Sequence, residues 1–124
     1  MSEFGLIEHI ARLFADVDHR GWEAIGDDCT VLPIGGDEAL AITTDMLVEG
    51  VHFLRDAISV EELGRKALAV NLSDVAAMGV PAVATLLSVA LPKDAGEEWA
   101  KEFIAGYHSL SKEYRSQQLH AGYV

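Results

Sequence analysis

The sequence predicts a small α+β domain with the element order α-β-β-α-β-α, in which a mixed sheet packs on helices. Two stretches, residues 2–17 and 95–114, repeat apolar residues at intervals of three and four, as amphipathic helices do. Two β-prone runs flank a Gly-Gly-Asp turn, and a long apolar run covers residues 82–91. With 124 residues, of which 50% are hydrophobic, one compact domain is expected.

The first predicted helix covers residues 2–17 and should bury one apolar stripe. The stripe consists of Phe4, Ile7, Ile10, Phe14 and Val17. Residues 18–26 are polar and contain glycine, which favours a loop.

Residues 29–34 and 39–45 predict a β-hairpin, because the Gly-Gly-Asp segment at 35–37 is typical of a tight turn. Pro33 has no amide hydrogen to donate, so the first strand should lie at an edge or be bulged at that residue.

The second predicted helix covers residues 59–78. Ser59 and Glu62 form a capping box at its start, and Gly79 followed by Pro81 should end it. The apolar run at 82–91 predicts a strand buried on both faces.

The last predicted helix covers about residues 95–114. Its buried stripe is Trp99, Phe103, Tyr107, Leu110 and Tyr114. Three strands make a thin sheet, whose edges call for a further strand from the chain or from a partner.

The composition excludes several classes of protein. Acidic residues outnumber basic ones by 20 to 9, giving a net charge of −11, which argues against a sequence-independent nucleic-acid binder. No apolar run is long enough to span a membrane. Cys29 is the single cysteine, and the start of the sequence does not resemble a signal peptide, so a cytoplasmic protein is expected.

The chemistry concentrates in an acidic stretch, because residues 21–54 contain no lysine or arginine. If the turn is centred between residues 36 and 37, Asp28 faces Asp45 across the hairpin. Directly opposed like charges are destabilising, so a divalent cation or a distant lysine would have to offset them. The role of the neighbouring Asp27 stays open.

Three further residues extend this candidate site. Thr43 and Thr44 precede Asp45, although threonine is also a common strand residue. Asp74 lies on an apolar helix, where a buried charge is usually paired or metal-bound, and Lys66 is the alternative partner. Carboxylate and hydroxyl oxygens favour Mg²⁺, which is typically held by one or two carboxylates together with substrate phosphates.

His52 lies between apolar neighbours and on periodicity alone is a packed residue. The sequence has no phosphate-binding P-loop, no Gly-x-Gly-x-x-Gly and no cysteine pair for zinc. Composition and spacing therefore lead to an acidic, Mg²⁺-binding α+β domain and no further.

Three segments resemble thiamine-monophosphate kinase. They are Gly-Asp-Asp-Cys-Thr-Val-Leu at 26–32, Thr-Thr-Asp-Met-Leu-Val-Glu-Gly-Val-His-Phe at 43–53, and the run from Lys66 to Gly79 that contains Asn-Leu-Ser-Asp. They occur in that family's order, and the resemblance covers about residues 3–114. Related enzymes of the aminoimidazole-ribonucleotide-synthetase superfamily share the Gly-Asp-Asp and Asn-Leu-Ser-Asp themes but differ in the middle segment.

The resemblance implies that residues 1–114 are the N-terminal Mg²⁺- and ATP-binding domain of a two-domain enzyme. Such an enzyme transfers the γ-phosphoryl group of ATP to thiamine monophosphate, giving thiamine diphosphate. The residues that match its Mg²⁺-binding positions, where several ions bind, are Asp28, Thr43, Thr44, Asp45 and Asp74. His52 matches a residue that touches the thiamine phosphate. A phosphate oxygen is already a competent nucleophile, so we nominate no catalytic base.

The resemblance also implies a homodimer formed through the N-terminal domains, which would cover the sheet edges. Residues 115–124 depart from the family pattern, because the family has a strand ending in Gly-Gly-Asp-Thr here and this sequence has Tyr123 where the acid should be. The family is two to three times longer, so we expect a truncation before the C-terminal domain and little or no kinase activity of this chain alone.

Two other interpretations stay open at this point. The chain could be another superfamily member, such as selenophosphate synthetase or a hydrogenase-maturation protein, although the segment at 43–53 argues against it. It could also be a non-catalytic dimerisation or metal-binding module, which would show no turnover even with a complementary C-terminal domain.

Overall fold

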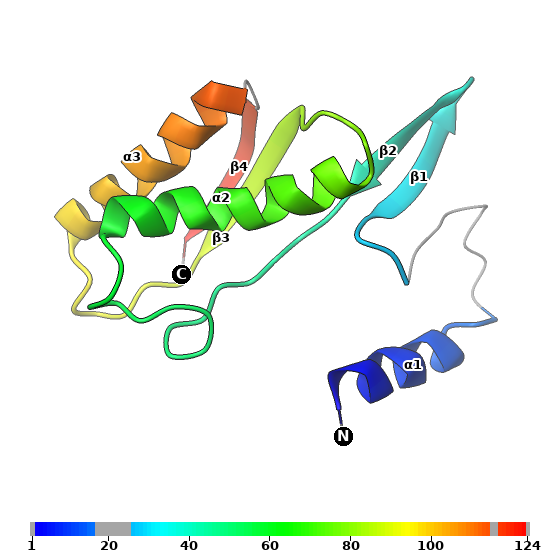
Figure 1. Ribbon diagram of the computed structural model, residues 1–124, viewed down its shortest axis with the longest axis horizontal. Coiled ribbons are helices and arrows are strands. Elements are labelled where there is room, and N and C mark those ends of the chain that lie inside the picture. The colour runs from blue at the N-terminus through cyan, green and yellow to red at the C-terminus, as the bar shows by residue number, and fades with distance from the viewer. Residues whose placement is uncertain (1, 17–25, 115–116, 124) are drawn as a thin grey trace. The chain divides into compact units, whose positions relative to one another are not determined.

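The computed structural model describes residues 2–16 and 26–114 in full and the backbone of residues 117–123 (Figure 1). The chain divides into two compact units, Met1–Ile42 and Thr43–Val124. The α+β class and the predicted order of elements are confirmed, and one further strand follows the last helix.

The first helix of the N-terminal unit is α1 (Glu3–Leu13). The Ser2 side chain caps it by accepting a hydrogen bond from the Gly5 amide at 3.1 Å. The predicted buried stripe is wrong for the described residues, because none of α1 is buried and Phe4 is 82% exposed. Periodicity indicates which face a helix can bury, but it does not supply the surface that would cover that face. Val17 and the predicted loop at 18–25 lie outside the described residues.

The predicted hairpin is formed by the antiparallel strands β1 (Thr30–Gly35) and β2 (Glu38–Ile42). Gly36 has a φ of +59°, the left-handed conformation that tight hairpin turns require. The register shifts between Pro33 and Gly35, which agrees with the second of the two predicted alternatives, a bulge beside the proline.

The second unit begins with a long connection and then α2 (Val60–Ala77). The predicted cap is confirmed, since the Ser59 hydroxyl accepts a hydrogen bond from the Glu62 amide at 3.1 Å. Gly79, with a φ of +74°, follows the helix end as predicted.

The core of this unit lies between α2, α3 (Glu97–Tyr114) and β3 (Ala84–Val89) (Figure 1). Leu68, Tyr107 and Leu110 form its buried centre, and Leu87 of β3 packs against them. The predicted stripe of α3 is confirmed for its middle residues, whereas Tyr114 is 58% exposed.

The two long helices approach closely because glycine stands at both contact points. A methyl group at Gly64 would overlap the backbone oxygen of Phe103, and one at Gly106 would overlap that of Glu61. The contact therefore joins backbone to backbone and leaves no room for a side chain at either position.

The strands differ from expectation in two respects. They form two separate two-stranded sheets instead of one: the hairpin, and β3 paired in parallel with β4 (Gln117–Tyr123), which was expected to be a tail. In addition, β3 is not buried on both faces, because exposed and half-buried residues alternate along it and Leu86 is 70% exposed. The helix pair covers one face of β3, and an apolar run does not reveal that the other face is open.

Candidate functional site

Three of the predicted site residues meet in the second unit. Thr43 and Asp45 come from the connection after β2, and Asp74 comes from α2. The Thr43 hydroxyl donates a hydrogen bond to Asp74 Oδ2 at 3.4 Å, and the Asp45 carboxyl group lies close enough to that of Asp74 for the two to interact. Asp74 and Thr43 are half-buried, whereas Asp45 and its neighbour Thr44 are exposed.

The proximity of two carboxyl groups alters the acidity of Asp45. Although the residue is exposed as a whole, partial desolvation of its carboxyl group raises its pKa. The negative charge of Asp74 and the hydrogen bond with it raise the pKa further, and His52 lowers it. Asp45 is therefore harder to ionise than an isolated aspartate.

The predicted pairing of Asp28 with Asp45 is wrong. Gly35 pairs with Glu38 as the predicted turn requires, but the bulge shifts every later pair by one residue. The paired region ends at Thr30 and Ile42, so neither aspartate lies in it. Among the described residues, the carboxyl group that acts on Asp45 is that of Asp74.

Asp28 belongs to the first unit, where it lies exposed before β1. Its amide donates a hydrogen bond to Asp27 Oδ1 at 2.8 Å, so the Asp27 side chain bonds locally to the segment before β1. Lys66, the alternative partner of Asp74, donates instead to the carbonyl oxygen of His52 at 2.7 Å. No ion pair joins Lys66 to Asp74 within the described part of the chain.

His52 is exposed and lies in a tight turn, so it is not the packed residue that its apolar neighbours suggest. Its Nδ1 accepts a hydrogen bond from the Val48 amide at 2.8 Å, and its own amide donates to the Val48 carbonyl at 2.8 Å. Gly50, with a φ of +79°, closes the turn by donating to the Phe53 carbonyl at 2.8 Å. Because Nδ1 is an acceptor, the neutral ring carries its proton on Nε2.

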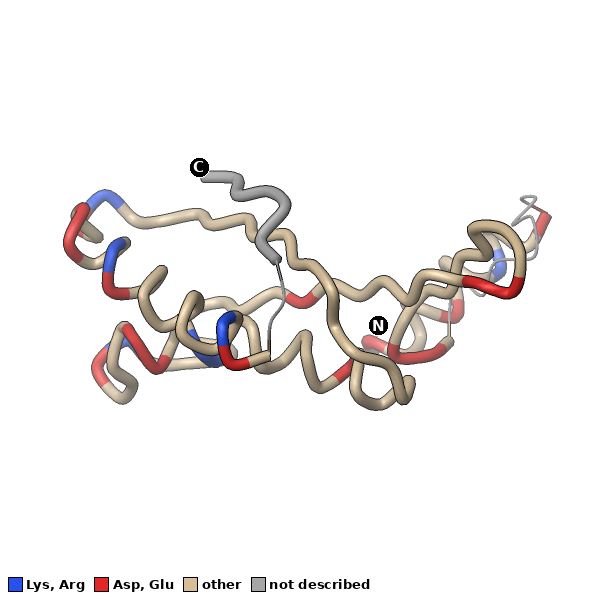
Figure 2. The backbone as a smooth tube through the Cα atoms, turned by 90° about the horizontal axis from the view of Figure 1, so that it is seen from above, with Lys and Arg blue, Asp and Glu red and all other residues tan. Residues whose placement is uncertain are grey.

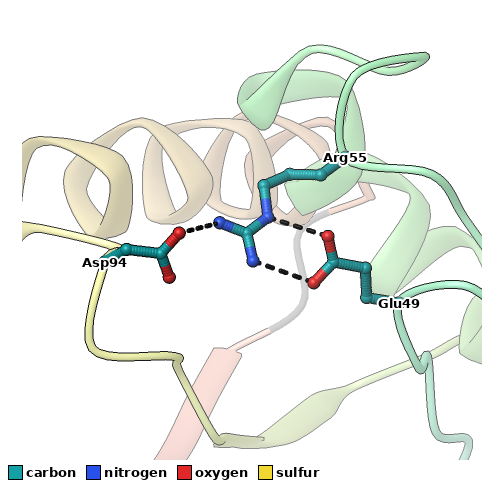
Figure 3. A network of polar contacts seen from close by, with 3 residues as sticks. All are labelled: Glu49, Arg55 and Asp94. Atoms are coloured by element: carbon teal, nitrogen blue, oxygen red, sulfur yellow. Dashed lines mark hydrogen bonds and ion pairs between the residues drawn. The ribbon is translucent and has the colours of Figure 1, made fainter.

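A charged cluster beside this turn was missed by the sequence analysis (Figure 3). Arg55 donates to both carboxylate oxygens of Glu49, from Nε and Nη2, at 2.9 Å each, and from Nη1 to Asp94 at 3.0 Å. The hydrogen bonds from Arg55 hold the pKa of Glu49 below its usual value, and both carboxylates raise the pKa of Arg55. The available signal was that Arg55 is the first basic residue after the acidic stretch.

The donor set fits Mg²⁺ only in part. From Gly26 to Leu54 the sequence has acidic residues and no lysine or arginine. Figure 2 marks the acidic positions of the chain in red and the basic ones in blue. However, in residues 2–16 and 26–114 no three acidic, histidine or cysteine side chains gather closely enough to hold a metal. Two carboxylates and a hydroxyl match the way Mg²⁺ is bound when substrate phosphates supply further oxygens.

The class of this α+β domain is identified by comparing its sequence with known protein families. The chain belongs to the family described as "AIR synthase related protein, N-terminal domain", which matches residues 26–119. Its relatives include proteins named thiamine-monophosphate kinase. The Escherichia coli protein is 47% identical over 121 residues, covering 95% of this chain and 36% of that protein. The Methanocaldococcus jannaschii protein is 35% identical over 115 residues, covering 92% of this chain and 36% of that protein.

Solved structures agree with this assignment. A structure described as "AaThiL complexed with AMPPCP and TMP" superposes with a TM-score of 0.86 at 34% identity, covering 98% of this chain and 37% of that one. The crystal structure of thiamine monophosphate kinase from Aquifex aeolicus gives a TM-score of 0.79 at 31% identity, covering 99% of this chain and 39% of that one. The chain thus spans about a third of the length of the curated relatives it matches. Within the described residues, no helix is both long and apolar enough to cross a membrane.

Proposed function

We propose that this chain is the N-terminal part of a kinase that uses ATP to phosphorylate thiamine monophosphate, giving thiamine diphosphate. Relatives that carry this name support the proposal, as does the similar structure that holds AMPPCP, an ATP analogue, and TMP. The observation that carries it is the contact of Asp45 with Asp74, which concentrates oxygen ligands beside the half-buried Thr43.

The proposed roles follow from charge. Asp45, Asp74, Thr43 and Thr44 would hold Mg²⁺ ions, and bound Mg²⁺ supplies the positive charge that neutralises the phosphates. The resemblance gives Asp28 a Mg²⁺-binding role as well. Without that charge, a paired-carboxylate site repels anionic substrates. His52, with its proton on Nε2, would donate a hydrogen bond to the thiamine phosphate. No side chain is needed as a base, since positioning and charge neutralisation dominate phosphoryl transfer.

We further propose that the chain alone has little or no turnover. The chain spans about a third of the length of its relatives, and the resemblance places an acid where this sequence has Tyr123. The proposed location is the cytoplasm, and the proposed assembly is a homodimer that covers strand edges. A monomer in sedimentation at tens of micromolar would contradict the dimer.

Two experiments test the function. The first is calorimetric titration of the purified chain with Mg²⁺ and ATP, with and without thiamine monophosphate, and with Asp45→Asn as the matched variant. We expect binding of thiamine monophosphate that requires Mg²⁺ and is lost in Asp45→Asn.

The second experiment joins residues 1–114 to the C-terminal two-thirds of the Escherichia coli relative and measures formation of thiamine diphosphate. Turnover in the fusion that Asp45→Asn abolishes supports the kinase. A folded fusion without turnover, together with no Mg²⁺-dependent binding by the chain, would favour a non-catalytic module.

A further inference from the structure

We propose that Arg55 is a positioning residue, which fixes the turn at residues 48–53 and thereby orients His52 toward a phosphate group. The inference rests on the proposed function for the ligand, and it adds a residue outside the predicted site. It starts from the cluster of Arg55, Glu49 and Asp94 (Figure 3).

The guanidinium of Arg55 is held from two sides. Its Nε and Nη2 atoms each donate to one oxygen of Glu49 at 2.9 Å, a bidentate arrangement that fixes direction as well as distance. Its Nη1 atom donates to Asp94 at 3.0 Å, on the connection between β3 and α3. With donors of all three nitrogens engaged, Arg55 is suited to hold the turn in place and poorly suited to receive a phosphate itself.

Glu49 links this cluster to His52 through a short run of backbone. Glu49 forms an isolated bridge with Phe53, and the Gly50 amide donates to the Phe53 carbonyl at 2.8 Å. Inside the turn so closed, the Val48 amide donates to His52 Nδ1 at 2.8 Å. Restraining Glu49 therefore restrains the backbone on either side of the imidazole.

A second anchor acts on the other side of the histidine. Lys66 of α2 donates from Nζ to the His52 carbonyl at 2.7 Å, which ties the turn to the helix that carries Asp74. Arg55 and Lys66 thus hold opposite ends of one segment. An exposed ion pair contributes little to stability, so the expected effect of Arg55 is on local geometry.

The test compares four variants of the full chain. Arg55→Gln removes the whole cluster, Glu49→Gln removes the partner within the turn, and Arg55→Lys keeps the charge but not the bidentate geometry. Lys101→Gln is the control, because Lys101 also pairs with two exposed carboxylates, on α3. Nitrogen NMR of the His52 ring at pH 8 reports its tautomer, and titration with thiamine monophosphate in Mg²⁺ reports binding.

We expect one dominant tautomer, protonated at Nε2, in the wild-type chain and in Lys101→Gln. Arg55→Gln and Glu49→Gln should show both tautomers in exchange and bind thiamine monophosphate about tenfold to a hundredfold more weakly. Arg55→Lys keeps the charge but not the bidentate geometry, so it should show the wild-type tautomer only in part. If charge alone mattered, this variant would show the wild-type tautomer in full.

The results separate the positioning role from the function. Ring signals unchanged in both Arg55→Gln and Glu49→Gln would overturn the positioning role, whatever the binding result. If the wild-type chain does not bind thiamine monophosphate but the ring signals respond as expected, the proposed function fails and the positioning of His52 stands.

Discussion

The carboxyl groups of Asp45 and Asp74 lie close enough for Asp74 to raise the pKa of Asp45, although one residue lies in the connection after β2 and the other in α2. Partial desolvation raises the pKa of Asp45, and the negative charge of Asp74 raises it further. The close approach of these two carboxyl groups is therefore electrostatically unfavourable. Such a pair is explained if its function is to bind a cation.

The first prediction concerns Asp45→Asn. The folded pKa of Asp45 is raised above its usual 3.8, so the protonated group stabilises the fold below that pH, and this contribution is lost as the pH rises through the folded pKa. At pH 7 without Mg²⁺, the free energy of unfolding of Asp45→Asn should be unchanged or slightly higher, within about 0.5 kcal/mol. Its Mg²⁺ affinity should fall at least about tenfold. Denaturant unfolding and calorimetry measure the two quantities.

The matched control is Asp37→Asn, at the exposed tip of the hairpin, which should alter neither quantity. A large loss of stability in metal-free Asp45→Asn would mean that Asp45 is a structural hydrogen-bonding residue. The role given to it here would then be wrong.

The sequence identified the residues of this pair but not their pairing. Asp45, Thr43 and Asp74 were recognisable from residue type and from the resemblance. Their contact was not, because it joins a loop to a helix and depends on tertiary packing. Asp28 was placed opposite Asp45 by an uninterrupted register, and one extra residue at the Pro33 bulge was enough to change every later pair.

The second prediction concerns the pH dependence of Glu49. Hydrogen bonds from Arg55 lower its pKa, so this interaction stabilises the fold above the usual value of 4.5 and is lost as the pH falls through the lowered folded pKa. In Arg55→Gln the pKa of Glu49 should rise toward 4.5, as followed by carboxyl-carbon NMR. Asp94→Asn removes only the second partner of Arg55 and should leave the pKa of Glu49 low. An equally low pKa in Arg55→Gln would contradict this.

The third prediction concerns the close contact of α2 with α3. Alanine usually stabilises a helix relative to glycine, but at Gly64 or Gly106 its methyl group meets backbone atoms that have no freedom to rotate away. Gly64→Ala and Gly106→Ala should each lower the free energy of unfolding by about 1–3 kcal/mol. Gly96→Ala is the control, since nothing lies within 4 Å of its added methyl group. Equal stability of all three variants in urea would exclude the close approach.

Helix-capping and turn residues predicted the fold better than the periodicity of apolar residues predicted burial. Ser59, Gly79 and the turn at 35–37 act through neighbouring residues, and each is found where the sequence places it. The exposure of Phe4 and Leu86 depends on which surfaces are present to cover them, and that information is not local. The same limit applies to Arg55, whose partner Asp94 lies far along the chain.

The last prediction separates the core from the open face of β3. Leu68 is 1% exposed at the centre of the core, so Leu68→Ala should lower the free energy of unfolding by about 2–5 kcal/mol. Leu86 is 70% exposed, and Leu86→Ala should change it by less than about 0.5 kcal/mol in dilute solution. Urea unfolding at low and high protein concentration measures both. If Leu86→Ala lowers the free energy of unfolding more at high protein concentration than at low, self-association covers this face. If it lowers the free energy of unfolding as much as Leu68→Ala does at every concentration, the observed exposure of Leu86 is contradicted.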